Sequence, residues 1–495
     1  MLSDLRESGC LTAGTRVQRA DTGAEVTLGE LLASGERDVP VWSLDERLRL
    51  VARPMTHAFP SGTKEAFRLT LTSGRTVEAT ANHPFLTLDG WRRLDQVGPG
   101  SRLAVPRRLP DPQRTEPWPE HEVVLLAHLI GDGSFVRRQP LRYASTDEEN
   151  LRAVTDAAGA FGIAAVRDDH PAARCTSLRL PAPFRLTHGR RNPIAAWLDG
   201  LGLFGLRSHE KFVPDGVFGL PREQVALLLR HLWATDGCIH RGRAAGQLRI
   251  YYATTSRRLA DDVTRLLLRL GILTRTKTVG KAGYRAGYHV VVTGADDQRA
   301  FLRDVGSHGG RGVIAEAALE ELGDRIGNTN VDTVPREVWE HVRALLSGSG
   351  MTHRAFSAGI GTQFCGSTLW KHSVSRSRLA RVAAVLDDAD LEMLATNDVF
   401  WDEVRSVESI GEQPVFDATV LGTHNFIANG IAVHNSIEQD ADMVVLMHRP
   451  DAFERDDPRA GEADLILAKH RNGPTATITV AHQLHYSRFV DMAQG

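Results

Sequence analysis

The sequence has few cysteines, and their spacing indicates neither a metal site nor a disulfide framework. Its 495 residues contain four, which are scattered and include no C-x-x-C pair: Cys10, Cys175, Cys238 and Cys365. Zinc ligands and disulfide-rich folds normally show closely spaced cysteines, so both classes are disfavoured. A chain without a disulfide pattern fits a reducing compartment, and we expect it in the cytoplasm.

Long hydrophobic runs are also missing. No stretch of about 18 apolar residues occurs, and the N-terminal "MLSDLRESGC" is charged and lacks the apolar core of a signal peptide. We therefore expect no membrane partner. The formal net charge of −2 excludes a uniformly basic nucleic-acid coat but allows a local basic surface. With 42% hydrophobic and 24% charged residues the chain should fold, and its length predicts two to four domains.

Patterns typical of β-strands occupy both ends of the first 435 residues. Residues 10–106 are β-rich, and "RTVEATANHPFLTLDGWRRL" (75–94) predicts a hairpin. A proline-rich stretch at 105–121 indicates a linker, and β character returns at 401–435. Because an isolated hairpin is marginally stable, we expect the two β-rich pieces to form one domain.

The region between them has helical periodicity and a weak internal repeat. "LLAHLIGDG" (125–133) and "LRHLWATDG" (229–237) are both apolar stretches with helical spacing that end in Asp-Gly. This similarity predicts two copies of one structural unit. Residues 331–400 are also helical in pattern, and 351–386 could form a helix-turn-helix-like unit, although many helical hairpins share that pattern.

The ends of this long segment carry side chains that can break and form peptide bonds. Cys10 offers a thiol beside Gly9, whose carbonyl is unhindered. Asn435 has a side-chain amide that can attack its own main-chain carbonyl and cut the chain, and Ser436 offers a hydroxyl across that bond. His434 can supply acid–base help. Each residue taken alone is equally typical of a turn, a cap or a small buried side chain.

Two further motifs support a chemical interpretation. The motif "TANH" places Thr80 and His83 at i and i+3, where the pair could polarise the Gly9 carbonyl and protonate the departing amide nitrogen. The motif "DATVLGTHNF" adds Asp417 and His424. All four side chains are also compatible with ordinary strand or turn positions.

In order and content these motifs resemble those of inteins, and the resemblance covers residues 10–435. It implies a Hint-type splicing fold and a reaction in four steps that needs no cofactor. Cys10 attacks the Gly9 carbonyl to form a thioester, Ser436 attacks that thioester, Asn435 cyclises, and the remaining ester rearranges to a peptide bond. The resemblance also implies supporting roles: Thr80 and His83 in the first step, Asp417 in the coupling steps, and His424 and His434 in the cyclisation.

The flanking residues resemble a second family. Removing 10–435 joins "MLSDLRESG" to "SIEQDADMVVLMHRP", which is similar to the C-terminal end of the RecA-like ATPase domain of bacterial replicative DNA helicases. Residues 465–489 resemble the same family. This implies that Gln439 lies near the nucleotide γ-phosphate or the DNA-coupling region. It also implies that Lys469 and Arg471 act on ATP bound by a neighbouring subunit, although "KHRNGP" alone is typical of a basic turn after a strand.

The helicase portion lacks its phosphate-binding loop. No G-x-x-x-x-G-K-[ST] motif occurs, so this chain alone is not expected to hydrolyse ATP. Either Met1 begins a fragment, or the start of the gene was placed too late. For the complete host protein the resemblance implies ATP with Mg²⁺ as cofactor, and hexamer subunits, single-stranded DNA and primase as partners after splicing.

The repeated Asp-Gly helices resemble those of LAGLIDADG homing endonucleases. This implies that Asp132 and Asp236 hold Mg²⁺ at the scissile phosphates of double-stranded DNA. The motif "KFVP" implies that Lys211 is an electrostatic helper. His231 and Thr235 depart from the small residues usual in that family, so retained DNA cleavage stays open. DNA contacts are expected from Arg-rich stretches, with phosphate contacts dominating affinity.

Together these resemblances predict a multidomain chain. A β-rich Hint-type splicing domain is split by an α+β LAGLIDADG-type endonuclease and followed by an α/β RecA-like helicase fragment, in a protein of the cytoplasm associated with the nucleoid. Two alternatives remain: a homing endonuclease with decayed splicing, and a helicase module with a structural insertion. The expected boundaries are 1–9 and 436–495 for the host, 10–120 and 401–435 for splicing, 121–330 for the endonuclease, and 331–400 for a helical subdomain that could recognise DNA.

Overall fold

The structure is a computed structural model whose described residues lie in several ranges. These are 9–170, 175–185, 190–241, 248–280, 283–323, 331–363, 366–435, 443–449, 459, 461–470, 476–483 and 488–491. Among the helices in these ranges, none combines the length and apolar character that crossing a membrane requires.

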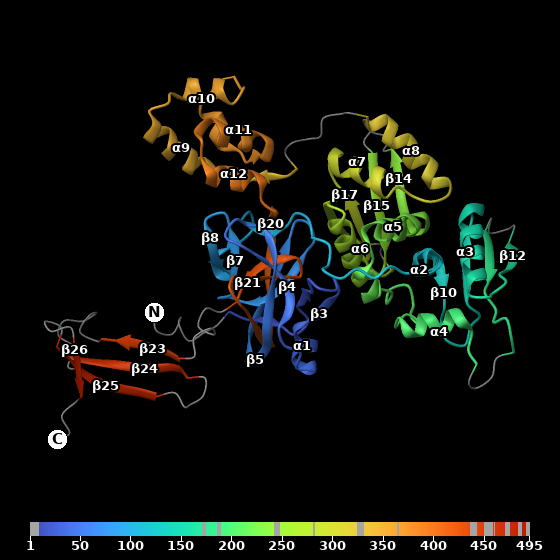
Figure 1. The fold of residues 1–495 in the computed structure, drawn as a ribbon, viewed down its shortest axis with the longest axis horizontal. Coiled ribbons are helices and arrows are strands. Elements are labelled where there is room, and N and C mark those ends of the chain that lie inside the picture. The colour runs from blue at the N-terminus through green and yellow to red at the C-terminus, as the bar shows by residue number, and fades with distance from the viewer. Residues whose placement is uncertain are drawn as a thin grey trace.

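Two six-stranded sheets make up a β-domain at the centre of Figure 1. The first sheet has the strand order β4-β5-β6-β1-β20-β9, and the second has the order β3-β2-β21-β22-β7-β8. Their bounds are β1 Leu11–Thr12, β2 Arg16–Gln18, β3 Glu25–Thr27, β4 Val39–Leu44, β5 Leu50–Leu71, β6 Thr76–Thr80, β7 Pro84–Thr87, β8 Gly90–Arg93, β9 Arg102–Pro106, β20 Val399–Val420, β21 Asn425–Ala428 and β22 Ile431–His434. Helix α1 (Leu28–Ser34) begins at a capping box formed by Thr27 and Glu30.

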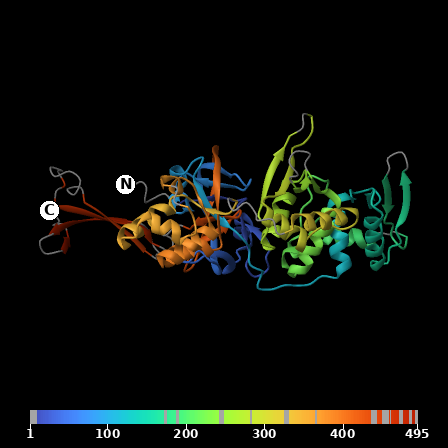
Figure 2. The same ribbon diagram turned by 90° about the horizontal axis from the view of Figure 1, so that it is seen from above.

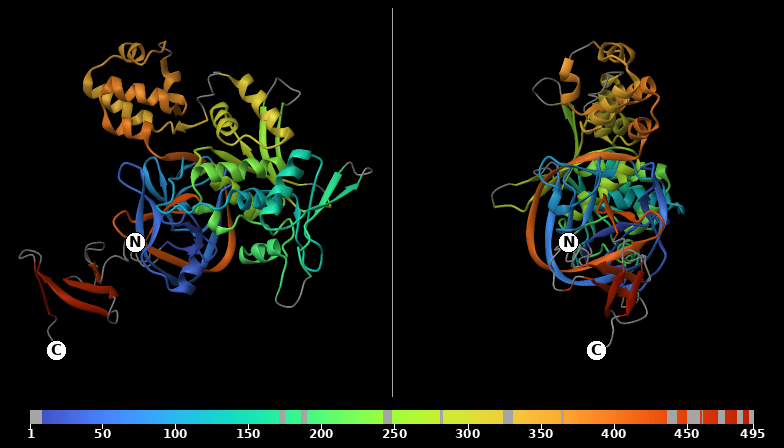
Figure 3. Two further views of the ribbon diagram at one scale, coloured as in Figure 1. Left: turned by 45° about the vertical axis from the view of Figure 1, so that its right-hand side comes forward. Right: turned by 90° about the vertical axis from the view of Figure 1, so that its left-hand side faces the viewer.

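Strands from the two ends of the sequence alternate within both sheets. β20 pairs with β1, β5 and β9, whereas β21 pairs with β2 and β22 pairs with β7. In Figure 3 the orange β20 runs beside the blue N-terminal strands. The shared core contains fully buried Val77 and Phe85 from the first piece and Phe426 and Val433 from the last. Because each sheet takes strands from both pieces, the two β-rich ends form a single folded unit.

The insert after β9 contains two units with the same topology. Each runs helix, strand, strand, helix, strand, strand, and the sheet orders β10-β11-β13-β12 and β14-β15-β17-β16 correspond. The first unit is α2 Glu120–Asp132, β10 Gly133–Ser134, β11 Arg142–Ser145, α3 Glu148–Ala160, β12 Val166–His170 and β13 Cys175–Arg179; the second is α5 Arg222–Asp236, β14 Gly237–Arg241, β15 Leu248–Thr254, α6 Arg257–Arg269, β16 Thr274–Val279 and β17 Gly287–Val292. The structural repeat predicted from the two Asp-Gly stretches is confirmed. Around these units lie α4 Pro193–Gly200, η3 Asp215–Gly219, α7 Ala295–Asp304 and α8 Gly310–Leu322.

Helices α2 and α5 pack against each other at the centre of the insert. A Cβ atom added to Gly131 would lie 2.0 Å from Thr235 Oγ1, so only glycine fits at this contact. His231 does not disturb the pairing, because its Nδ1 lies 3.0 Å from His128 Nε2 and its ring packs on His308. Burial lowers the pKa of His231 to about 3 and that of His128 well below its usual value. The departure at position 231 is therefore accommodated as a neutral, hydrogen-bonded contact, and Thr235 fits against Gly131 with its hydroxyl donating to Leu232 O at 2.6 Å.

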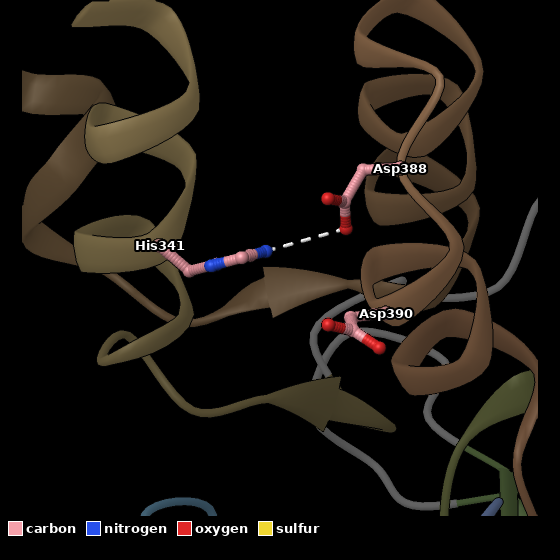
Figure 4. Close-up of side chains that lie close together, drawn as sticks. All are labelled: His341, Asp388 and Asp390. Atoms are coloured by element: carbon pink, nitrogen blue, oxygen red, sulfur yellow. Dashed lines mark hydrogen bonds and ion pairs between the residues drawn. The ribbon is translucent and has the colours of Figure 1, made fainter. Parts of the chain in front are cut away.

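A small helical unit with its own core lies above the β-domain in Figure 1. Its elements are β18 Thr333–Val334, α9 Val338–Ser349, α10 His353–Gly359, η4 Gly366–Lys371, β19 Val374–Ser375, α11 Arg376–Leu386 and α12 Ala389–Thr396. A 3₁₀ helix and strand β19 separate α10 from α11, so the helix-turn-helix-like reading of 351–386 was wrong, since that motif joins its helices by a turn of a few residues. Figure 4 shows His341 of α9 facing Asp388, which caps α12. The 3.3 Å contact between His341 Nε2 and Asp388 Oδ1 links α9 to the start of α12.

The β-domain and the insert share a buried charged contact. Arg265 of α6 bonds the carboxylate of Glu25 on β3, and its Nη1 lies 3.1 Å from Asp262 Oδ1. The side chain of Glu25 is 3% exposed and that of Asp262 is fully buried. Burial raises the pKa of Glu25 to about 7, whereas the positive charge of Arg265 acts in the opposite direction. Main-chain atoms reinforce the contact, with Thr276 N donating to Ser73 O at 2.7 Å.

Replacing Arg265 with methionine should destabilise the chain by about 3–5 kcal/mol, because it removes the nearest cation from buried Glu25, which keeps only Arg16 at 3.9 Å, and one of the two arginines paired with Asp262. A buried carboxyl group can be held neutral, and its folded-state pKa then lies above the unfolded value. Stability is therefore lost as pH rises through that pKa, so the loss should be larger at pH 8 than at pH 5.5. Thermal unfolding at both pH values measures it. Arg167→Met removes an exposed ion pair with Glu148 and should shift the melting temperature far less; equal shifts would contradict the prediction.

The C-terminal residues form a separate four-stranded antiparallel sheet of order β23-β24-β25-β26. The strands are β23 Met443–His448, β24 Glu462–His470, β25 Ala476–Gln483 and β26 Arg488–Asp491. The sheet projects from the β-domain in Figures 1 and 2. In the described part of this region no helix accompanies the sheet, so the helical component of the expected α/β fold is not seen there.

Candidate active site

Cys10 lies at the entrance to β1, fully buried, with its main chain held by Thr80. Cys10 N donates to Thr80 Oγ1 at 2.9 Å, and Thr80 N donates to Cys10 O at 3.0 Å. The Thr80 hydroxyl in turn donates to Asn82 Oδ1 at 2.7 Å. This arrangement follows from the pairing of β1 with β6, in which Leu11 lies opposite Ala79. Thr80 therefore contacts the nitrogen that would leave if the bond before Cys10 broke.

His83 packs directly against Gly9 on the other side of that bond. A Cβ atom at Gly9 would lie 2.6 Å from the Cα of His83, so a larger residue does not fit without movement. The imidazole is fully buried, and its polar neighbour is the main chain of Gly9. Burial lowers the pKa of His83 to about 4, although the main chain of Gly9 favours the protonated form. At neutral pH the ring is uncharged and able to accept a proton.

The C-terminal junction lies at the end of β22. Asn435 is fully buried, and its N–H donates to His424 O at 3.0 Å. Neither polar atom of its side-chain amide has a hydrogen-bond partner among the described residues. His434 Nδ1 forms a short contact with Asn435 O, and its ring packs edge-on against Trp91 with centroids 4.8 Å apart. The nucleophilic amide of Asn435 is thus unpartnered, while its own carbonyl is paired with a neighbouring imidazole.

Strand pairing brings the two junctions together. Val433 pairs with Phe85, two residues beyond His83, and the charge of His434 acts on the pKa of His83. On the other sheet, Leu11 pairs with Phe416, and continuing this register sets Cys10 opposite Asp417. Asp417 is 1% exposed, and its Oδ1 accepts a hydrogen bond from Ala418 N at 2.7 Å. Residues from opposite ends of the segment therefore meet in one buried region.

Two neighbours of these residues carry no local sequence signal that would have indicated them. Lys64 of β5 places Nζ 3.5 Å from Cys10 Sγ, and Trp91 of β8 packs on His434. Lys64 is one of few lysines in an arginine-rich chain, which could have drawn attention to it. Trp91 belongs to the predicted hairpin and would have been found only by pairing that hairpin with the C-terminal strand.

A second cluster lies where α2 and α5 end. Asp132 and Asp236 both line a cavity of about 460 Å³. The walls of the cavity desolvate the carboxyl groups and raise the pKa of both, that of Asp132 to about 6, and repulsion from Asp236 contributes to that rise. Both side chains still reach solvent. Two oxygen donors from separate helices, each disfavoured as a bare anion, are a set that fits a hard divalent cation.

Basic side chains bind the carbonyl groups at the C-terminal ends of α2 and α5. Lys211 is 3% exposed, and its Nζ donates to Ile130 O at 2.9 Å and to Gly133 O at 2.8 Å. Arg311 of α8 bonds the carbonyls of Ala234 and Thr235 at the corresponding end of α5. Burial lowers the pKa of Lys211 to about 8, whereas Asp236 and Asp132 act to raise it. Sequence reasoning missed Arg311, because nothing in its local motif distinguishes it from other surface arginines.

The expected residues of the helicase portion are mostly not described. Ser436, Gln439 and Arg471 lie outside the described residues. Lys469 is part of β24, opposite Val444 of β23, but only its main chain is described.

Comparison with known proteins decides the family. The family model described as "Intein splicing domain" matches residues 17–435. The chain belongs to the intein splicing domain family. This membership indicates self-splicing catalysis. The matched residues include most strands of the β-domain, and the last of them is Asn435.

Similar proteins extend beyond the intein itself. The chain is 38% identical over 501 residues to replicative DNA helicase DnaB of Synechocystis sp. strain PCC 6803, covering 99% of this chain and 57% of that protein. It is 43% identical over 503 residues to the DnaB of Rhodothermus marinus, covering 99% and 53%. A crystal structure of a DnaB intein from Synechocystis is 37% identical, covering 20% of this chain and 70% of that one, with a TM-score of 0.20.

Both curated relatives are replicative DNA helicases, and almost the whole of this chain is similar to them. The chain spans about half the length of the curated relatives it matches.

Proposed function

We propose that the chain excises residues 10–435 by protein splicing and joins Gly9 to Ser436. The observation that carries this proposal is that Cys10 and Asn435 are both buried in one β-domain, whose sheets are built from both ends of the segment. A structural insertion would not require an unpartnered amide at Asn435, where burial without hydrogen bonds is unfavourable.

The first step would convert a peptide bond into a thioester. Cys10 Sγ attacks the carbonyl carbon of Gly9, and the amide nitrogen of Cys10 leaves. Thr80 holds that nitrogen through its hydroxyl, at 2.9 Å. His83, neutral at pH 7, can take up a proton near Gly9 and return it to the leaving nitrogen.

The later steps would release the intein. Ser436 attacks the thioester, with Asp417 supporting the coupling of the two ends. The Asn435 side chain then attacks its own main-chain carbonyl, which His434 polarises through the contact to Asn435 O. His424 orients the junction through its carbonyl, which accepts from Asn435 N. Effective concentration within this preformed site supplies a large part of the rate without any cofactor.

Splicing would restore part of a replicative helicase. The four-stranded C-terminal sheet exposes large apolar side chains, including Val445, Met447 and Ile478. A sheet face of this kind is normally covered by another layer, which supports its assignment as an incomplete host domain. In the complete host, Gln439, Lys469 and Arg471 would act at ATP and Mg²⁺ between subunits of a hexamer that engages single-stranded DNA and primase.

A second activity is favoured by the paired carboxylates of the insert. Asp132 and Asp236 line one cavity at the ends of twin helices, with Lys211 and Arg311 nearby. We propose a site-specific endonuclease acting on double-stranded DNA, in which these carboxylates would hold Mg²⁺. When bound, the ion would supply Lewis-acid stabilisation of the leaving oxygen. Lys211 fixes the end of α2 and places positive charge beside both carboxylates.

Intact mass spectrometry of freshly expressed chain tests the main proposal. The wild type should yield an excised 426-residue intein and a ligated 69-residue product, lengths that follow from cutting the 495 residues before 10 and after 435. The double variant Cys10→Ala, Asn435→Ala should remain as one unprocessed species. A single full-length mass for both proteins would refute splicing of this chain.

A further inference from the structure

Lys64 brings a positive charge to the sulfur of Cys10. Its Nζ lies 3.5 Å from Cys10 Sγ, within hydrogen-bond range of sulfur. Lys64 is half-buried on β5, where it pairs with Gln413 of β20, whereas Cys10 is fully buried at the start of β1. The contact therefore joins the two longest strands of the β-domain to the first residue of the intein. The ammonium group thus lies beside a side chain that water does not reach.

A buried thiol needs help to become a nucleophile. The thiolate is the attacking species, and removal from water disfavours it, whereas a neighbouring lysine favours it. Charge interactions are also stronger away from bulk water. His83 does not provide the compensating charge, because its pKa of about 4 leaves it neutral at pH 7. The carboxyl group of Asp417, which the strand register sets opposite Cys10, would act against the thiolate when ionised. An ammonium group at 3.5 Å supplies the positive charge that the thiolate needs.

We propose that Lys64 is a catalytic residue of the first splicing step, whose ammonium group stabilises the thiolate of Cys10. This inference rests on the proposed splicing function and adds a residue to it. The sulfur donates its electron pair to the carbonyl carbon of Gly9, and the bond between that carbon and the Cys10 nitrogen breaks. The nitrogen leaves as an amine carrying the proton that the thiol gave up. Lys64 keeps its protons throughout, so it contributes charge and transfers nothing.

The test isolates the first step in the full chain. Asn435→Ala and Ser436→Ala together block the later steps, and dithiothreitol then releases residues 1–9 at a rate set by thioester formation. This rate is measured by mass spectrometry from pH 6 to pH 9.5. Lys64→Met should slow release about 10- to 100-fold at pH 7 and approach the parent rate at high pH, because a neighbouring cation matters most where little thiolate is present. Lys64→Arg, which keeps the charge, should retain most of the rate.

The controls separate a charge effect from a structural one. Arg68→Met removes another cation of β5, which pairs with Glu78, and should leave the profile unchanged. If Lys64→Met does not fold, Lys64→Gln keeps much of the side chain without the charge and repeats the comparison. An unchanged rate, or a loss equal at every pH, would overturn the role of Lys64. Release that persists in Cys10→Ala would instead overturn the splicing mechanism itself.

Discussion

Asn435→Ala should abolish release of residues 436–495 and leave the N-terminal thioester step intact. The substitution removes the amide that attacks the main-chain carbonyl, so C-terminal cleavage should fall by at least about 10³-fold. Because the Asn435 side chain forms no hydrogen bond with the described residues, replacing it with alanine breaks none there. Thermal unfolding should therefore change little. Mass spectrometry after overnight incubation measures the released fragment.

Selective loss is the decisive feature of this result. In Asn435→Ala, dithiothreitol should still release residues 1–9, whereas in Cys10→Ala it should not. Asn435→Gln keeps the amide but requires a larger ring, and we expect slow release rather than none. Normal release of 436–495 from Asn435→Ala would exclude side-chain cyclisation as the cleavage reaction.

Asp132→Asn should abolish DNA cleavage while leaving splicing unchanged. The substitution keeps the shape of the side chain but removes one of the two negative charges that would hold Mg²⁺, so cleavage of a DNA target should fall by about 10²-fold or more. The carboxylates lie in the insert, whereas Cys10 and Asn435 lie in the β-domain. The expected measurement is Mg²⁺-dependent nicking or cutting of helicase-gene DNA that lacks the intein sequence.

Two controls test whether the effect of Asp132→Asn is specific to DNA cleavage. Asp156→Asn alters an exposed carboxylate of α3 outside the cavity and should leave cleavage intact. Splicing of Asp132→Asn, followed by mass spectrometry, should equal that of wild type. A splicing defect in Asp132→Asn would show that the two proposed activities are coupled. Absence of cleavage in the wild type, with splicing intact, would remove the endonuclease proposal alone.

The sequence by itself determined the chemistry of the two junctions. Cys10 after Gly9, and Asn435 between His434 and Ser436, indicate acyl transfer because their side chains can attack adjacent carbonyls wherever the chain places them. The alternation of β character at both ends and the repeated Asp-Gly stretches likewise predicted a split β-domain and a duplicated insert, since both depend on local periodicity. Local pattern did not suffice at 351–386, where a 3₁₀ helix and a strand take the place of the expected turn.

Only the tertiary structure decided which residues surround those groups. Pairing of β22 with β7 brings Asn435 near His83, and pairing of β1 with β20 brings Cys10 near Asp417, across more than four hundred residues of sequence. The local motifs do not indicate three of these neighbours, which are Lys64 at the thiol, Trp91 on His434 and Arg311 at the end of α5. The shifted pKa of His83 has the same origin, because burial is a property of the packed domain and no residue carries it alone.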